Sequence, residues 1–270
     1  MTCSAHNKSW MEKKIVKTSA KCTILKNSAK TLMAGKYYFA IMTLIFSGML
    51  TLLFNRFTYN LNSRICLTLM DMLNMSENSP MIIALSYVLP LVMSIVLGIL
   101  QIGMCLFFLN IVTGRPFYTF DLLYGYLHEF GKSFRLSGVL TLLSFVCFLP
   151  FDILLDIYQS GYRMSAELLL ILASLQLVLL LIYVPVSLAL SQAFYVYLDY
   201  PDLSATEILK MSMKIMKGKK RQLFYVRLSF LPLFLLVLVT FGLGLFWFLP
   251  YYHVTMSLYY LDLMKPQDPS

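Results

Sequence analysis

Long apolar runs separated by short polar segments dominate this chain. A membrane helix needs about 20 mostly apolar residues to cross the roughly 30 Å hydrocarbon core of a bilayer. Six runs meet that length, and they cover residues 37–54, 81–109, 136–157, 167–190, 223–241 and 243–263. The pattern predicts an all-α fold, a polytopic transmembrane helix bundle with about six spans.

Prolines and glycines predict a bend in the second span and a reversal between the last two spans. The second run contains Pro90 and Gly98 and is longer than one span needs, so we expect a tilted or bent helix. Only the sequence TFGLG separates the last two runs, and Gly242 and Gly244 there permit a tight reversal. The alternative is one long final span, which would give five spans and place the tail on the outer side.

The distribution of cations predicts the orientation. With six spans, all but three of the 22 lysines and arginines fall in the N-terminal segment, 110–135, 191–227 and the tail. The outer loops then hold only Arg56, Arg64 and Arg163. Cations concentrate on the cytoplasmic side of membrane proteins, so both termini are predicted to be cytoplasmic. Residues 1–36 form a basic cytoplasmic segment with an amphipathic helix, 37–263 the six-span domain and 264–270 a cytoplasmic tail.

Composition agrees with a membrane protein. It disfavours a soluble domain and a fold held together by disulfides or metal ions. The chain is 59% hydrophobic and 13% charged, whereas a soluble domain carries about 25% charged residues. The five cysteines are far apart and form no C-x-x-C pair, so they are interpreted as small hydrophobic residues rather than a disulfide or metal framework.

One stretch, MKGKKRQLFYVRLSF (216–230), places cations directly before an uncharged run. We interpret these cations as a membrane-interface anchor that contacts a lipid bilayer with anionic head groups. Nucleic-acid binding is not expected, since no separate exposed basic surface is apparent. The anchor residues are Lys217, Lys219, Lys220, Arg221 and Arg227.

The segment before this anchor predicts a short amphipathic helix. Ser204 and Glu207 have the spacing of a capping box, and Leu203 and Ile208 occupy the flanking hydrophobic positions. We expect this amphipathic helix to lie on the inner leaflet. The alternative is a helix packed under the bundle.

Similar short motifs recur at three places. Gly35-Lys36, Gly131-Lys132 and Gly218-Lys219 each precede an odd-numbered span, and the even-numbered spans end in FFLN, VYLD and YYLD. We infer three parallel helical hairpins, each preceded by a short interfacial helix. The GKS at 131–133 lacks the first glycine of a phosphate-binding loop, so it is interpreted as a helix start.

Few residues have the character of a functional site. Asp152 and Asp156 share a helix face, and intramembrane carboxylates often mark ion paths. Alternatively, the span ends near Asp152, because Pro150 allows an early exit, and both aspartates are interfacial. His253 either faces a cavity or is a packing residue. We name all three as transport candidates. No grouping supports catalysis, and no cofactor or metal is expected.

The last third of the chain resembles the bacterial integral-membrane family called domain of unknown function 975. In this chain, residues 197–263 contain the motifs M-K-G-x-K, L-S-F and T-x-G-x-G and a Pro-Tyr pair. The segment SAKTLMAGKYYFAI (28–41) is similar to the family's N-terminal segment. The resemblance implies a multi-span bacterial membrane protein and no established activity. Where family members often have tryptophan, this chain has Leu231-Pro232, which implies a kink.

From these observations we expect a non-enzymatic accessory or scaffold in the bacterial plasma membrane that acts with lipids and a membrane-protein partner. A small-molecule or lipid transporter is the alternative. A transporter would depend on the two aspartates and His253, whereas an accessory would depend on the helix at 203–221.

Overall fold

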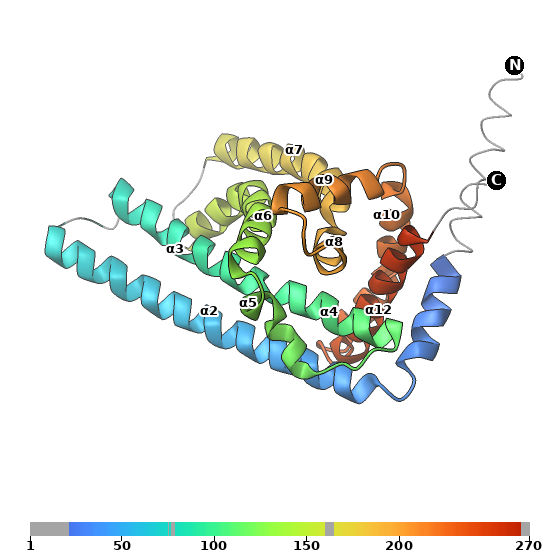
Figure 1. Cartoon of the computed structure of the whole chain (residues 1–270). Helices are drawn as coiled ribbons and strands as arrows, with labels where there is room; N and C mark the ends of the chain where they lie inside the picture. Colours follow the sequence, from blue (N-terminus) through green and yellow to red (C-terminus); the bar gives the residue numbers. More distant parts are fainter. Residues whose placement is uncertain (1–21, 75, 77–78, 160–164, 266–270) are drawn as a thin grey trace, which may run out of the picture.

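The chain folds as helices joined by short turns (Figure 1). The structure, a computed structural model, describes residues 22–74, 76, 79–159 and 165–265, and this described part contains no strand. A first helix covers residues 22–33, and we call it the N-terminal helix. The other helices are α2 (Tyr37–Leu73), α3 (Pro80–Gly98), α4 (Leu100–Thr113), η1 (Thr119–Leu123), α5 (Tyr124–Leu127), α6 (Phe130–Gln159), α7 (Ala166–Leu190), α8 (Ala193–Asp199), α9 (Ala205–Ile215), α10 (Lys220–Leu228), α11 (Leu231–Val239) and α12 (Leu245–Met264).

Five helical segments of the described chain are long and apolar enough to cross a membrane. They cover 37–73, 81–113, 130–158, 166–199 and 220–239. The sixth predicted span corresponds to α12, which has 20 residues but carries tyrosines, His253 and Asp262 and is not among these five. The chain is therefore a multi-pass α-helical membrane protein, while a sixth crossing by α12 stays a prediction.

The first helical hairpin is longer than the hydropathy pattern predicted. The first span was expected to end at residue 54, but α2 continues to Leu73, where Asn74 adopts φ 49° and closes the helix. Arg56 and Arg64 consequently lie within a helix and not in a loop. At 1.5 Å per residue α2 is about 55 Å long, well beyond the hydrocarbon thickness. In Figure 1, α2 and α3 extend together away from the rest of the molecule.

Prolines act differently at the three positions that the sequence singled out. The chain breaks between α10 and α11 directly before Pro232, as the resemblance implied. Pro150, by contrast, lies inside α6 and does not end the helix, which continues to Gln159. Pro90 is likewise inside α3, and the interruption of that span falls at Ile99, next to Gly98.

The reversal between α11 and α12 has the predicted tight geometry. Phe241 and Gly242 adopt φ values of 51° and 89°, and the Gly242 amide donates to the carbonyl of Val237 at 2.9 Å. The Thr240 hydroxyl accepts a hydrogen bond from the Gly244 amide at 3.1 Å. Because these bonds satisfy main-chain groups at the end of α11, the chain can turn back immediately.

The hairpins α2–α3, α6–α7 and α11–α12 pair neighbouring helices. Their returning arms meet in the interior, where α4 packs against both α8 and α12. Tyr195 of α8 stacks on Tyr260 of α12 with ring centroids 5.0 Å apart, and the Tyr260 hydroxyl donates to Asp199 at 2.6 Å. Aromatic pairs of this kind add about 1 kcal/mol each beyond area burial. We call α4, α8 and α12, together with the N-terminal helix, α5 and α9 that surround them, the basic end.

Candidate functional site

The N-terminal helix and α9 are two copies of one structural unit at the basic end. Both end in the sequence Met-x-Gly-Lys, at Met33–Lys36 and Met216–Lys219. In each helix we compare the methionine with the residues four and eight positions before it. These three positions are buried in both helices, and each of the six side chains is at most 7% exposed. Residues spaced by four share one helix face, so both helices bury the same face. The buried pairs are Leu25 and Ile208, Ala29 and Ser212, and Met33 and Met216.

The turns that follow these helices also match. Gly35 and Gly218 have φ values of 77° and 78°, in the left-handed region that costs a side chain about 1–2 kcal/mol. In both turns the lysine amide donates to the methionine carbonyl, at 2.9 Å and 3.1 Å. The middle copy differs, because Glu129 adopts the positive φ of 47° and Gly131 lies within α6.

The lysines of the first two Gly-Lys pairs connect the two ends of a hairpin. Lys36 Nζ donates to the carbonyl of Ile111 at the end of α4, and Lys132 Nζ donates to the carbonyl of Pro201 just beyond α8. At the third pair, the main-chain carbonyl of Lys219 accepts a hydrogen bond from the Tyr259 hydroxyl at 3.3 Å. A cation near the last carbonyls of a helix stabilises its C-terminus.

Helix α9 has the predicted cap and packs against α6, α7 and α8. Ser204 accepts a hydrogen bond from the Glu207 amide at 3.4 Å, and its own amide donates to the Glu207 carboxylate at 2.9 Å. The Ser204 hydroxyl also donates to the Glu207 carboxylate at 2.6 Å. The hydrogen bonds that the hydroxyl and then the amide of Ser204 donate to this carboxylate lower the pKa of the Glu207 carboxyl. On the opposite face, the Ser212 hydroxyl donates to the carbonyl of Ala189 at 2.9 Å, which ties α9 to the end of α7.

The five anchor residues do not share one environment. Lys217 and Arg221 are exposed, whereas Lys219, Lys220 and Arg227 are half-buried. Of the five, therefore, Lys217 and Arg221 are the most accessible from outside the protein. The sequence indicated a single cationic anchor because it could not show which side of α10 packs against the core.

The two candidate aspartates line a groove between α3 and α6. Its volume is about 700 Å³. The Tyr87 hydroxyl of α3 donates to the carboxylate of Asp156, and Asp152 lies one turn earlier on the same face. Ser94 and Thr141 add hydroxyls to the groove wall. The sequence singled out the carboxylates but not Tyr87, because their contact joins residues 69 positions apart.

The third transport candidate, His253, lies apart from this groove. Its ring stacks on Phe108 of α4 with centroids 4.9 Å apart and an interplanar angle of 7°. The structure therefore does not bring the three transport candidates together. Among the described residues, no group of three histidine, cysteine, aspartate or glutamate side chains could hold a metal ion.

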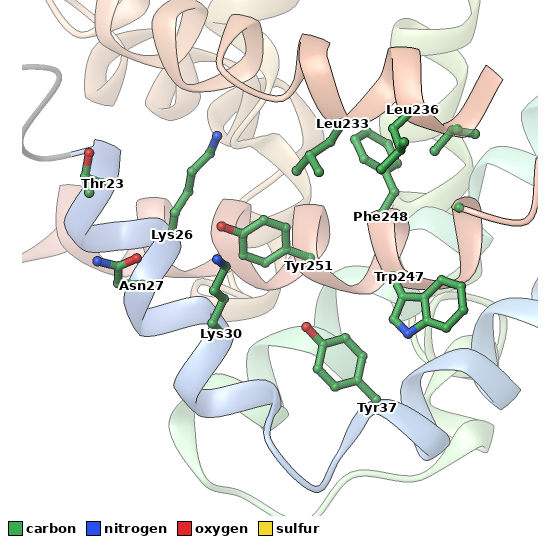
Figure 2. A pocket seen from close by; sticks show the side chains of 12 residues that line it. Thr23, Lys26, Asn27, Lys30, Tyr37, Leu233, Leu236, Trp247, Phe248 and Tyr251 are labelled. Atoms are coloured by element: carbon green, nitrogen blue, oxygen red, sulfur yellow. The ribbon is translucent and has the colours of Figure 1, made fainter. Parts of the chain in front are cut away.

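A further cavity lies between the N-terminal helix, α11 and α12 (Figure 2). Its volume is about 560 Å³. Lys26 and Lys30 border it on one side, and apolar side chains of α11 and α12 form the opposite wall. Sequence reasoning missed this cavity, since its walls come from segments about 200 residues apart. The remaining lining residues are Thr23, Asn27, Tyr37, Leu233, Leu236, Val237, Gly244, Trp247, Phe248 and Tyr251.

The helices, their long apolar surfaces and the basic end together define a polytopic α-helical membrane protein. The chain belongs to the family described as Protein of unknown function (DUF975), whose profile matches residues 18–267. The family resemblance inferred from the last third of the sequence is thus confirmed over nearly the whole chain. No curated protein and no solved structure matches it.

Proposed function

We propose that the protein is a non-enzymatic accessory or scaffold of the bacterial plasma membrane, with both termini in the cytoplasm. It would hold its basic end against the anionic lipids of the inner leaflet and present that end to a membrane-protein partner. The observation that carries the proposal is the repeated unit formed by the N-terminal helix and α9, in which each helix buries one face and carries lysines outside that face.

Charge and exposure support the contact with lipid. Lys210, Lys214 and Lys217 are exposed along α9 and its turn, and Arg221 of α10 is also exposed. Each lysine or arginine near an anionic membrane surface contributes about 1 kcal/mol of attraction. A helix with one apolar face in the bundle and a cationic face outward suits the head-group region.

The orientation is tested with single cysteines in a cysteine-free background. Asn74→Cys reports the far end of α2, and Lys217→Cys reports the basic end; both positions are exposed. A membrane-impermeant maleimide should label Asn74→Cys in intact cells and Lys217→Cys only after permeabilisation. The reverse pattern would overturn the proposed orientation.

The partner role is tested by mild-detergent purification from native membranes, with identification of the proteins that co-purify. We expect one protein at stoichiometric yield, and we expect Lys217→Gln with Arg221→Gln to reduce that yield. Asp152→Asn with Asp156→Asn is the matched control, because it also changes two charges but lies in the groove. A homo-oligomer without any partner would contradict the accessory role.

The groove between α3 and α6 supports a second candidate function, transport of a small molecule or lipid. Carboxylates inside a membrane protein are costly and are commonly retained for ion or solute movement. If this function holds, Asp152→Asn and Asp156→Asn should abolish uptake or efflux in reconstituted vesicles. Lys217→Gln with Arg221→Gln should leave that transport unchanged.

A further inference from the structure

We propose that the cavity between the N-terminal helix, α11 and α12 binds one anionic phospholipid of the leaflet next to the basic end. Its phosphate group would lie between Lys26 and Lys30, and one acyl chain would lie along α11 and α12. This inference rests on the proposed function, for which it supplies a specific lipid site.

The polar side of the cavity is built from one face of the N-terminal helix. Lys26 and Lys30 are four residues apart, so their side chains lie one above the other on that helix. Figure 2 shows both on the side that faces Tyr251 and α11. Lys26 is held in place, since its Nζ donates to the carbonyl of Ser229 at 2.7 Å and lies 4.2 Å from the centre of the Phe230 ring.

The described residues that line the cavity include two lysines and no carboxylate. Burial lowers the pKa of the Lys26 ammonium; Cys22 partly opposes this effect, and the positive charge of Lys30 adds to it. Two ammonium groups that border the same partly enclosed space repel each other, and a bound anion relieves that repulsion. The charge of the site therefore suits a phosphate diester rather than a cation.

The opposite wall suits a hydrocarbon chain. Leu233, Leu236, Phe248 and Trp247 come from two helices that turn back at residues 240–244. Leu236 is 54% exposed and Trp247 is 64% exposed, so the cavity opens onto the apolar outer surface of α11 and α12. A volume of about 560 Å³ is within the usual range for ligand sites. A soluble anion would use the lysines but would leave this apolar wall without a partner.

Trp247 provides a direct probe of the site. The chain has two tryptophans, and a Trp10→Phe background leaves only Trp247. This full-length variant is placed in nanodiscs of phosphatidylcholine with increasing fractions of acyl-brominated phosphatidylglycerol, which quenches a tryptophan that it contacts. The same titration with acyl-brominated phosphatidylcholine gives the reference. We expect quenching at a roughly fivefold lower fraction of the anionic lipid.

Two variants separate the site from general attraction to the membrane. Lys26→Gln with Lys30→Gln should remove the preference for the anionic lipid. Lys217→Gln with Arg221→Gln changes the same number of charges on the same end of the molecule, outside the cavity, and should keep it. Leu236→Phe narrows the apolar wall at an exposed position without adding a second tryptophan, and it should also reduce quenching of Trp247. The unfolding temperature of each variant in detergent establishes that it is folded.

The outcomes distinguish this site from the accessory role. Equal quenching by the two brominated lipids would overturn the lipid site, and a co-purified partner would still support the accessory role. Relief of quenching by millimolar inorganic phosphate would assign the lysines to a soluble anion and also overturn the lipid site. A selective lipid with no protein partner would support the site and contradict the accessory role.

Discussion

Lys36 Nζ lies 3.3 Å from the main-chain carbonyl oxygen of Ile111 and donates a hydrogen bond to it. Lys36 precedes α2 and Ile111 lies in the last turn of α4, so this bond joins the beginning and the end of the first hairpin. Lys132 makes the equivalent bond to Pro201 in the second hairpin. The Gly-Lys pairs thus fix hairpin geometry in addition to carrying charge at the basic end.

Loss of this cation should weaken the hairpin. We expect Lys36→Gln to lower the free energy of unfolding by about 1 kcal/mol, because a hydrogen bond from a charged donor is lost in a partly buried position. The measurement is unfolding in detergent with increasing denaturant. Lys210→Gln, at an exposed position on α9, is the control and should leave stability unchanged; equal effects of the two variants would contradict the role of the Ile111 contact.

The two matching turns should respond differently from the middle one. Gly35→Ala and Gly218→Ala force a side chain into a positive-φ turn and should each cost about 1–2 kcal/mol. Gly131→Ala should be neutral or slightly stabilising, since Gly131 is helical and an added Cβ would meet no atom within 4 Å. Thermal unfolding of the three variants side by side tests this prediction. If Gly131→Ala lowered the unfolding temperature as much as Gly35→Ala, the positive φ of the turn glycines would not explain the loss of stability.

The close approach of α4 to η1 leaves no room for a methyl group. A Cβ on Gly103 would lie 2.2 Å from the backbone carbonyl oxygen of Leu122, and that backbone cannot move aside cheaply. Gly103→Ala should therefore cost about 3 kcal/mol or prevent folding. Gly48→Ala is the helical control with no atom within 4 Å of the new Cβ, and it should be stable. Yield and monodispersity after purification give the first readout, and comparable behaviour of the two variants would disprove the prediction.

The cap of α9 should depend on pH. The folded state lowers the pKa of Glu207 through hydrogen bonds from Ser204, so the carboxylate adds stability above its unfolded pKa of about 4.3. That contribution is lost as the pH falls through the lower folded pKa. Hydrogen exchange of the first turn of α9 should be slower in the wild type than in Glu207→Gln at pH 6. The difference between the two proteins should be smaller at pH 3 than at pH 6.

Lys214→Gln serves as the comparison for this experiment, because Lys214 is exposed on the same helix and takes no part in the cap. Its exchange in the first turn should follow the wild type at both pH values. A difference between wild type and Glu207→Gln that persists unchanged at pH 3 would contradict the assigned pKa direction.

Local signals predicted the parts of this fold that depend on neighbouring residues. The hydropathy pattern located every long helix, and the spacing of Ser204 and Glu207 identified the α9 cap, because a cap is formed by residues three apart. Boundaries that depend on tertiary packing were less accurate. Neither Arg56 nor Arg64 ends α2, and Pro150 does not end α6, since a helix paired with a neighbour tolerates a charged residue at its surface or one missing amide hydrogen bond.

The sequence by itself determined that this protein is helical, membrane-embedded and basic at one end. The length of the apolar runs and the positions of the cations can be read directly from the order of the residues. It also encoded the repeated Met-x-Gly-Lys unit, whose turn is a local property of glycine. Only the tertiary structure decided which lysines bind carbonyls across a hairpin and which border a cavity. Those contacts join residues 69 or more positions apart, and their pairing is set by how the three hairpins pack against one another.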